Sequence, residues 1–202
     1  MLELWLIRHG ETDWNAEDRI LAGSDMPLNP AGLEQSRRLG ARIAELGTRF
    51  ETVYASDLAR ARVTAELAFP AASVRQDPRL RELDYGVFEG HRWHDLDESL
   101  AAAARHWRAD PYARRAPDGE SYDDVIARFE AFRSELPASG RFAVVSHGGT
   151  IRCASYAAMG RPARGTWGLE IANTGIVRLH YCEHTVTLVT LNDHAHLLGA
   201  RC

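Results

Sequence analysis

The sequence is poor in cysteine and lacks any hydrophobic run long enough to span a membrane. Its three cysteines, Cys153, Cys182 and Cys202, form no CxxC pair, and their odd number argues against both a zinc site and a disulfide framework. The first residues include the acidic Glu3 and show no signal-peptide pattern. These absences predict a soluble, unprocessed protein of the reducing cytoplasm.

The chain also lacks an excess of basic residues, internal repeats and low-complexity segments. A formal net charge of −4 and a pI near 6.1 argue against nucleic acid or an anionic membrane as the main partner. What the chain does have is 202 residues of which 45% are hydrophobic, enough for one core. We therefore expect a single domain over residues 1–202, a small anionic molecule as partner, and either a monomer or a homodimer.

The pair His-Gly occurs twice, each time directly after a short apolar run. His9 follows residues 4–7 and Arg8, and His147 follows residues 142–146. Each run reads as a buried strand that is followed by helical signals, which places each histidine at the carboxyl end of a strand. Ligands of open parallel sheets bind outside the strand carboxyl ends. The two histidines should therefore face one another across one site.

The remaining pattern predicts an α/β fold. Turn and capping residues separate the predicted elements, and Ser56 with Asp57 is the candidate cap of the second helix. Glycines around residues 79–90 predict a loop over the site. Trp93, Trp107 and Trp167 read as core or pocket-wall residues. We expect helices over 29–47, 58–69, 91–108, 121–136 and 150–159, and further strands over 52–55, 72–76, 175–181 and 185–191.

The charged residues near these strand ends suit a phosphoryl group. Such a group needs planar cations for its oxygens, a nucleophile for its phosphorus and an acid for its leaving oxygen. Arg8 and Arg60 follow strands whose ends we expect to be adjacent, and guanidinium groups match phosphate oxygens well. One histidine can attack phosphorus while the other stabilises the transition state. Glu82 and Glu89 are the candidate acids, and this scheme requires no metal and no cofactor.

Four motifs in order resemble those of the histidine phosphatase superfamily, in its branch of phosphoglycerate mutase-like phosphatases. The resemblance implies a three-layer α/β/α sandwich with a mostly parallel sheet, His9 as the nucleophile and Glu82 as the general acid. It further implies that the phosphoryl group is bound by Arg8, Arg60 and His147, with Asn15 adding a hydrogen bond and Gly148 at the same site. The motifs are Arg8-His9-Gly10-Glu11-Thr12, Ser56-Asp57-Leu58-Ala59-Arg60-Ala61, Arg81-Glu82-Leu83 and Ser146-His147-Gly148-Gly149.

Two departures from the family pattern bear on the substrate. Cofactor-dependent mutases of the family carry an insertion after the acid loop, whereas here only a short cap, about residues 91–121, fills that place. Leu21-Ala22-Gly23 stands where relatives often have a Gly-Trp pair. The first departure favours hydrolysis of small phosphate esters through a phosphohistidine. The alternatives are a phosphoglycerate mutase, a ribazole phosphate phosphatase of cobalamin synthesis and a catalytically silent binder of a phosphorylated ligand.

Two histidine pairs lie outside these motifs. His91 and His94 have i, i+3 spacing on a predicted helix, which suits a metal, but a solvated helix face is the simpler interpretation. His194 and His196 lie near the end of the chain, where we expect a flexible tail or the edge of a lid. We therefore expect no metal site at either pair.

Overall fold

The computed structural model describes residues 1–161 and 168–198, so Trp167 and Cys202 lie outside the described residues. Its centre is a six-stranded sheet of order β3-β2-β4-β1-β5-β6. The first four strands in this order are parallel, and the last two are antiparallel to their neighbours. The strands are β1 (Leu2–Arg8), β2 (Thr52–Ala55), β3 (Val74–Gln76), β4 (Gly140–Ser146), β5 (Ile176–Cys182) and β6 (Thr185–Asp193).

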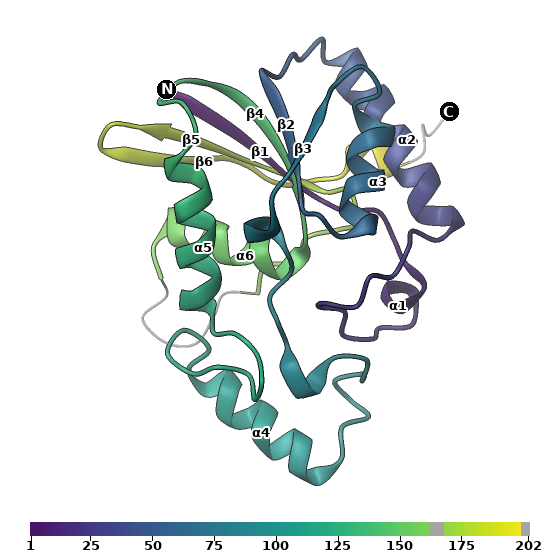
Figure 1. The fold of residues 1–202 in the computed structure, drawn as a ribbon, viewed down its shortest axis with the longest axis vertical. Helices are drawn as coiled ribbons and strands as arrows, with labels where there is room; N and C mark the ends of the chain where they lie inside the picture. Colours follow the sequence, from purple (N-terminus) through teal and green to yellow (C-terminus); the bar gives the residue numbers. More distant parts are fainter. Residues whose placement is uncertain (162–167, 199–202) are drawn as a thin grey trace.

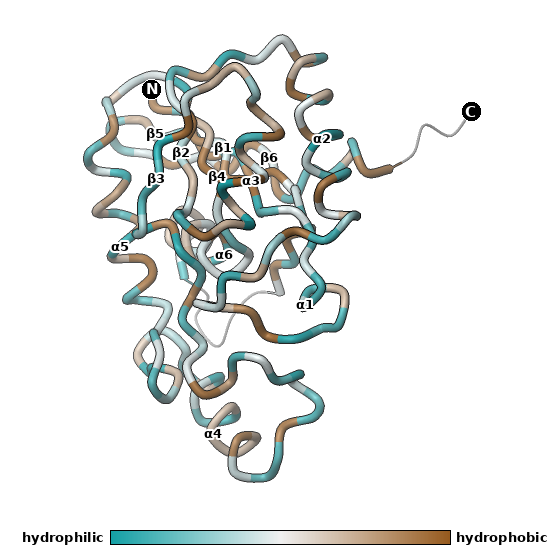
Figure 2. The backbone as a smooth tube through the Cα atoms, turned by 45° about the vertical axis from the view of Figure 1, so that its right-hand side comes forward, coloured by the Kyte–Doolittle hydropathy of each residue, from teal (hydrophilic) through white to brown (hydrophobic). Residues whose placement is uncertain are grey.

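Helices cover both faces of this sheet, which confirms the predicted three-layer α/β/α sandwich. The helices α2 (Pro30–Glu45) and α3 (Ala59–Ala68) pack on one face. The helices α5 (Tyr122–Ser134) and α6 (Gly148–Met159) cover the other face (Figure 1). In Figure 2, α2 alternates between hydrophobic and hydrophilic stretches, as expected of a helix with one face against the sheet.

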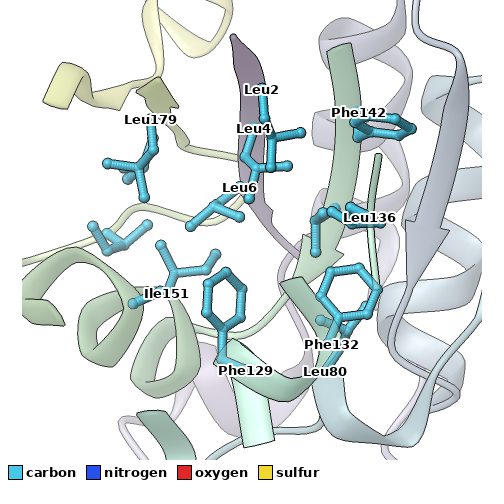
Figure 3. Close-up of a cluster of buried hydrophobic side chains, with 14 residues drawn as sticks. Leu2, Leu4, Leu6, Leu80, Phe129, Phe132, Leu136, Phe142, Ile151 and Leu179 are labelled. Carbon is cyan, nitrogen blue, oxygen red and sulfur yellow. The ribbon is translucent and has the colours of Figure 1, made fainter. Parts of the chain in front are cut away.

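The core between the sheet and α5 and α6 is apolar. Leu6 of β1, Phe129 of α5 and Ile151 of α6 are almost fully buried and belong to one cluster, shown in Figure 3. Burying each such side chain contributes roughly 1.5–3 kcal/mol. This packing fixes the position of α6, whose first residues reach the strand ends.

The cap lies at the far end of the molecule from the strand amino ends (Figure 1). Its helix α4 (Glu98–Ala109) buries Trp107 in a third cluster, which also contains Phe88 and Tyr122. The remaining elements are short: α1 (Asp13–Ala16), η1 (Pro78–Leu80), η2 (Gly86–Phe88) and η3 (Ala195–Leu197).

The predicted helix over 91–108 is wrong in its first turns, because α4 begins only at Glu98. Residues of the preceding segment are bound instead to the chain near α1. Ile20 N donates to His91 O at 2.8 Å, and Arg92 Nε donates to Glu17 O at 2.6 Å. His91 and His94 therefore do not share a helix face.

The predicted cap of α3 is also wrong. Leu58 holds the cap position and makes no side-chain cap bond. The Ala59 N–H at the start of the helix donates instead to Asp25 Oδ1 at 2.7 Å, a residue far away in the sequence. The loop that contains Asp25 is therefore joined to the start of α3.

The predicted flexible tail at His194 and His196 is ordered. His194 precedes the 3-10 turn η3, and His196 Nε2 lies 2.8 Å from Thr174 Oγ1. Thr174 N in turn donates to Arg8 O at 3.0 Å. The segment therefore supports the backbone behind the first His-Gly motif rather than forming the edge of a lid.

Candidate active site

The register of β1 and β4 brings the two histidines together. These parallel strands pair in register as far as Arg8 and Ser146, so the next residue on each strand is a histidine. The ring centroids of His9 and His147 lie 5.0 Å apart, and both side chains are buried. The sequence prediction that they face one another is confirmed.

Arg60 reaches the same place by a different route from the one predicted. Strand β4 separates β1, which ends at Arg8, from β2, which precedes Arg60 in the sequence. The ends of β1 and β2 are therefore not adjacent, and this prediction is wrong. Arg60 lies near the start of α3, is fully buried, and donates from Nε to His147 Nδ1 at 3.2 Å. Arg60 therefore reaches the histidine pair from α3, whereas Arg8 is the last residue of β1.

The hydrogen bonds of the two rings assign opposite tautomers. His9 Nδ1 lies 2.7 Å from Gly10 O, an acceptor only, so Nδ1 carries the proton and Nε2 keeps its lone pair. His147 Nδ1 accepts from Arg60, so its Nε2 carries the proton. That Nε2 is buried and has no hydrogen-bond partner among the described residues. One ring thus offers a nucleophilic lone pair and the other an unused N–H.

Electrostatics keep both rings neutral. Burial and the nearby guanidinium groups of Arg60 and Arg8 hold the pKa of His9 well below its ordinary value of 6.5. Burial, Arg60 and His9 lower the pKa of His147 in the same way. Neutral imidazole is the nucleophilic form.

Arg8 faces the site from the end of β1. Its Nη1 donates to Ile171 O at 2.7 Å, which fixes the side chain, and its buried Nε has no partner among the described residues. Gly148 lies against this guanidinium, where an added Cβ would come within 3.4 Å of Arg8 Nε. Arg8 therefore has donors left for an anion.

Glu82 and Glu89, which the sequence left nearly tied, have different surroundings. Glu82 accepts from the N–H groups of Leu83, Gly149 and Thr150 at 2.8 to 3.1 Å, which holds it over the start of α6. A Cβ at Gly149 would lie 2.5 Å from Glu82 Oε1, so this approach requires glycine. Glu89 accepts from Ala22 N and Ser24 N instead, so it holds a loop.

That loop, residues 22–24, is also bound by Arg60. The guanidinium donates to Ala22 O at 2.7 Å and to Ser24 O at 2.8 Å. Arg60 therefore ties the loop to His147. The neighbouring Leu21 lines the site, as the departure at Leu21-Ala22-Gly23 predicts.

A cavity of about 160 Å³ lies beside Arg8 and His9. The predicted residues Arg60 and His147 are fully buried and do not line it, although the His147 ring lies 5.0 Å from that of His9. Asn15 lines it, and because its Oδ1 accepts from Thr12 N and Asn173 Nδ2, its amide can serve the cavity as a donor. The predicted residues Arg8, His9, Asn15, Glu82 and Gly148 line this cavity together with Arg19, Ile20, Leu21, Tyr85, Trp93, Gly149, Arg152, Glu170 and Ile171.

Three charged residues that line the cavity were not predicted from the sequence: Arg19, Arg152 and Glu170. Arg152 carried a usable signal, because it stands four residues after Gly148 on a helix and therefore shares its face. Arg19 and Glu170 stand outside the motifs, and the sequence gives no comparable signal for them.

Two structural features are absent from the described parts of the chain. Within residues 1–161 and 168–198, no group of three or more His, Cys, Asp or Glu side chains is arranged to hold a metal ion. In the same ranges, no helix has both the length and the apolar character to cross a membrane.

Comparison with known proteins decides the family. The family model of the histidine phosphatase superfamily (branch 1) matches residues 4–194. The chain belongs to this superfamily. This histidine phosphatase is 38% identical over 188 residues to a Salmonella arizonae protein named "Probable phosphoglycerate mutase GpmB", covering 91% of the chain and 86% of that protein.

Solved structures agree with this assignment. The histidine phosphatase described here superposes on the alpha-ribazole phosphatase from Shigella flexneri with a TM-score of 0.81 at 28% identity, covering 95% and 96% of the two chains. It superposes on a mycobacterial glucosyl-3-phosphoglycerate phosphatase with a TM-score of 0.83 at 29% identity, covering 94% and 98%.

Proposed function

We propose that the protein is a metal-independent phosphomonoesterase that acts on a small phosphorylated metabolite through a phosphohistidine. The observation that carries this proposal is the pair of neutral imidazoles in opposite tautomers, buried between Arg8 and Arg60. This arrangement supplies a nucleophile beside donors for the charge that develops on the phosphoryl oxygens.

The reaction would proceed in two steps. His9 Nε2 attacks phosphorus, the bond between phosphorus and the ester oxygen breaks, and Glu82 gives its proton to the departing alkoxide. Glu82 then takes a proton from water, whose oxygen attacks the phosphohistidine and releases inorganic phosphate. Arg8, Arg60, the His147 Nε2–H and the Asn15 amide bind the phosphoryl oxygens in both steps.

Transfer to a second substrate position, as in a phosphoglycerate mutase, has less support. Arg114 and Arg115 are neighbouring arginines of the cap, which fills the place of the mutase insertion. Arg114 Nη1 donates to His106 O, and Arg115 pairs with Asp124, so both are engaged outside the catalytic cavity. We therefore favour hydrolysis.

The cellular setting follows from smaller observations. Cys153 and Cys182 are free thiols, which supports the expected cytoplasmic location. The cap at about 91–121 packs against Tyr122 and Phe88 and thus belongs to the same domain in this proposal. Whether the enzyme acts as a monomer or a homodimer is not needed for the mechanism, since every proposed site residue comes from one chain.

The test is phosphate release from a panel of small phosphomonoesters in the presence of EDTA. We expect release that survives EDTA and disappears in His9→Ala, with a ³²P label trapped on the wild-type protein in samples quenched with alkaline detergent, because the N–P bond of phosphohistidine is labile in acid. Transfer of the phosphate within 3-phosphoglycerate would support the mutase instead. Near-normal release by His9→Ala would contradict the proposed mechanism.

A further inference from the structure

A second cavity lies in the cap, beside the catalytic cavity. This cap cavity has a volume of about 210 Å³. Three of its lining side chains, Tyr85, Trp93 and Arg152, also line the catalytic cavity, so the two share a boundary. Its other walls are Trp107, Arg108, Pro111 and Tyr122.

The walls of the cap cavity are mostly aromatic rings. Trp93 and Trp107 are nearly parallel, at 9° and 6.0 Å between centroids, and Tyr85 meets both edge-on at 5.9 Å. Tyr122 meets Trp107 edge-on at 6.0 Å. Rings in such arrangements present faces and edges that attract a further flat ring. The lining contains no carboxylate, so it does not favour a cationic group.

The two cations of the cap cavity are already engaged with its walls. The Arg108 guanidinium lies 4.0 Å from the centroid of the Trp93 ring. Arg152 Nε donates to Leu169 O at 2.9 Å, and its guanidinium also bonds the Tyr122 hydroxyl. Planar guanidinium groups held in this way extend an aromatic wall.

One polar atom of the lining has no partner. Trp107 is buried, and its indole Nε1 makes no hydrogen bond to any described residue. An unused N–H in an apolar wall costs free energy, which an acceptor atom on a bound ring would recover. The lining thus suits a flat ring that carries a nitrogen or oxygen acceptor.

The volumes of the catalytic cavity and the cap cavity also favour a substrate with a ring. The catalytic cavity, at about 160 Å³, is smaller than the roughly 300–1,000 Å³ typical of small-molecule sites. An apolar cavity of roughly 150 Å³ is enough for a benzene ring, so the cap cavity can hold a ring. Each of these two adjoining cavities alone is below the usual size of a metabolite site, and the two together reach it.

We infer that the leaving alcohol of the substrate carries a flat heteroaromatic ring, which binds in the cap cavity against Trp93 and Trp107. This inference rests on the proposed phosphatase function and adds the class of its substrate. The phosphoryl group lies at His9, and the chain between phosphate and ring passes the boundary formed by Tyr85, Trp93 and Arg152.

The test compares esters that differ only in the ring. A purine ribonucleoside 5′-monophosphate and ribose 5-phosphate share the same primary alkoxide, and so do 2-(indol-3-yl)ethyl phosphate and propyl phosphate in close approximation. We expect kcat/KM to favour the ring-bearing ester by about tenfold or more in both pairs, mainly through KM, as stacking of one ring predicts. Equal kcat/KM within both pairs would overturn the inference while leaving the phosphatase proposal intact.

Matched variants locate the ring. Trp93→Ala removes a wall of the cap cavity, and Tyr112→Leu alters the same aromatic cluster at a residue that lines neither cavity. We expect Trp93→Ala to reduce the preference to about threefold or less and Tyr112→Leu to keep it, with thermal melts confirming that both fold. An unchanged preference in folded Trp93→Ala would refute the assignment of the ring to this cavity. Failure to hydrolyse any ester of either pair would instead count against the phosphatase itself.

Discussion

His9 and His147 follow equivalent strand ends, yet they carry their protons on different nitrogens. The difference comes from one neighbour each: a carbonyl accepts from His9 Nδ1, whereas the Arg60 guanidinium donates to His147 Nδ1. If either ring moved its proton to the other nitrogen, it would lose its Nδ1 hydrogen bond. The division into nucleophile and donor is thus determined by backbone and arginine positions rather than by the histidines themselves.

This division predicts how the two rings titrate. Burial and the adjacent Arg60 lower the pKa of both histidines, so we expect both to stay neutral at pH 6.5, with His9 protonated at Nδ1 and His147 at Nε2. Long-range ¹H–¹⁵N spectra would show this, with His9→Ala and His147→Ala spectra to assign the signals. Doubly protonated rings at both positions at pH 6.5 would contradict the electrostatic argument.

The two loop carboxylates lead to a second residue-scale prediction. Glu82→Gln keeps the shape but removes the acid, so we expect the first step, measured as alcohol released in the first turnover, to slow by about 10²–10⁴-fold for alkyl esters and far less for 4-nitrophenyl phosphate. Glu89→Gln is the matched control, because Glu89 holds residues 22–24 and does not line the catalytic cavity. If only the Glu89 variant depended on the leaving group, the assignment of the acid would be reversed.

At the scale of elements, the start of α3 shows what a sequence can and cannot predict. Ser56 and Asp57 are good capping residues in the right place, but the cap of Ala59 N comes from Asp25, which no local pattern indicates. The first turns of the predicted helix at 91–108 fail for the same kind of reason, since contacts between His91 and Ile20 win over local propensity.

The site motifs were predictable because each combines a strand end with a chemically distinctive residue. His9, His147 and the helix α6 lie where the sequence places them. The position of β4 between β1 and β2 was not predictable, because strand order depends on pairings between distant segments. The cap cavity likewise depends on how Trp93 and Trp107 meet across a turn, which periodicity does not encode.

The long-range cap of α3 has a measurable consequence. Asp25→Ala removes an acceptor at the helix start, so we expect the free energy of unfolding to fall by about 0.5–2 kcal/mol, or roughly 1–8 °C in Tm. Because Arg60 is the second residue of α3, kcat/KM should fall as well. Asp57→Ala is the comparison: it removes a surface pair with Arg81 and should leave the helix start intact. A larger loss of Tm in Asp57→Ala than in Asp25→Ala would contradict this assignment and support Asp57 as the capping residue, as the sequence predicts.

At the scale of the whole molecule, the buried histidines make stability depend on pH. Their folded pKa values lie below the unfolded value of 6.5, so the unfolded chain binds more protons once the pH falls below about 6.5. The contribution of the two histidines to stability is therefore fully present above pH 6.5 and is lost as the pH falls towards their folded pKa values. The loss is at most about 1.4 kcal/mol per pH unit for each histidine.

Urea unfolding between pH 7.5 and 5 would measure this dependence. We expect the free energy of unfolding to decrease below pH 6.5 and the decrease to be shallower in His9→Ala, which lacks one of the two groups. Glu3 adds a second window: burial raises its pKa, but the Trp5 indole, Arg141 and Arg178 outweigh this and lower it to about 2, so its contribution is lost as the pH falls below 4.5. A free energy of unfolding that is flat from pH 7.5 to 5 would show that the histidines are not buried as described.

The pairing of β1 has a consequence for how the protein is made. Both neighbours of β1 in the sheet, β4 and β5, come from the later part of the chain, and the Arg141–Glu3 contact between β4 and β1 spans 138 residues. A ribosome adds residues at roughly 5–20 per second, so β1 waits on the order of ten seconds for a partner. His9 is thus synthesised well before β4, yet it gains its place beside His147 only when synthesis has passed β4. Ribosome-bound chains that stop before residue 140 would contain His9 but lack β4 and His147, so we expect them to form no phosphohistidine.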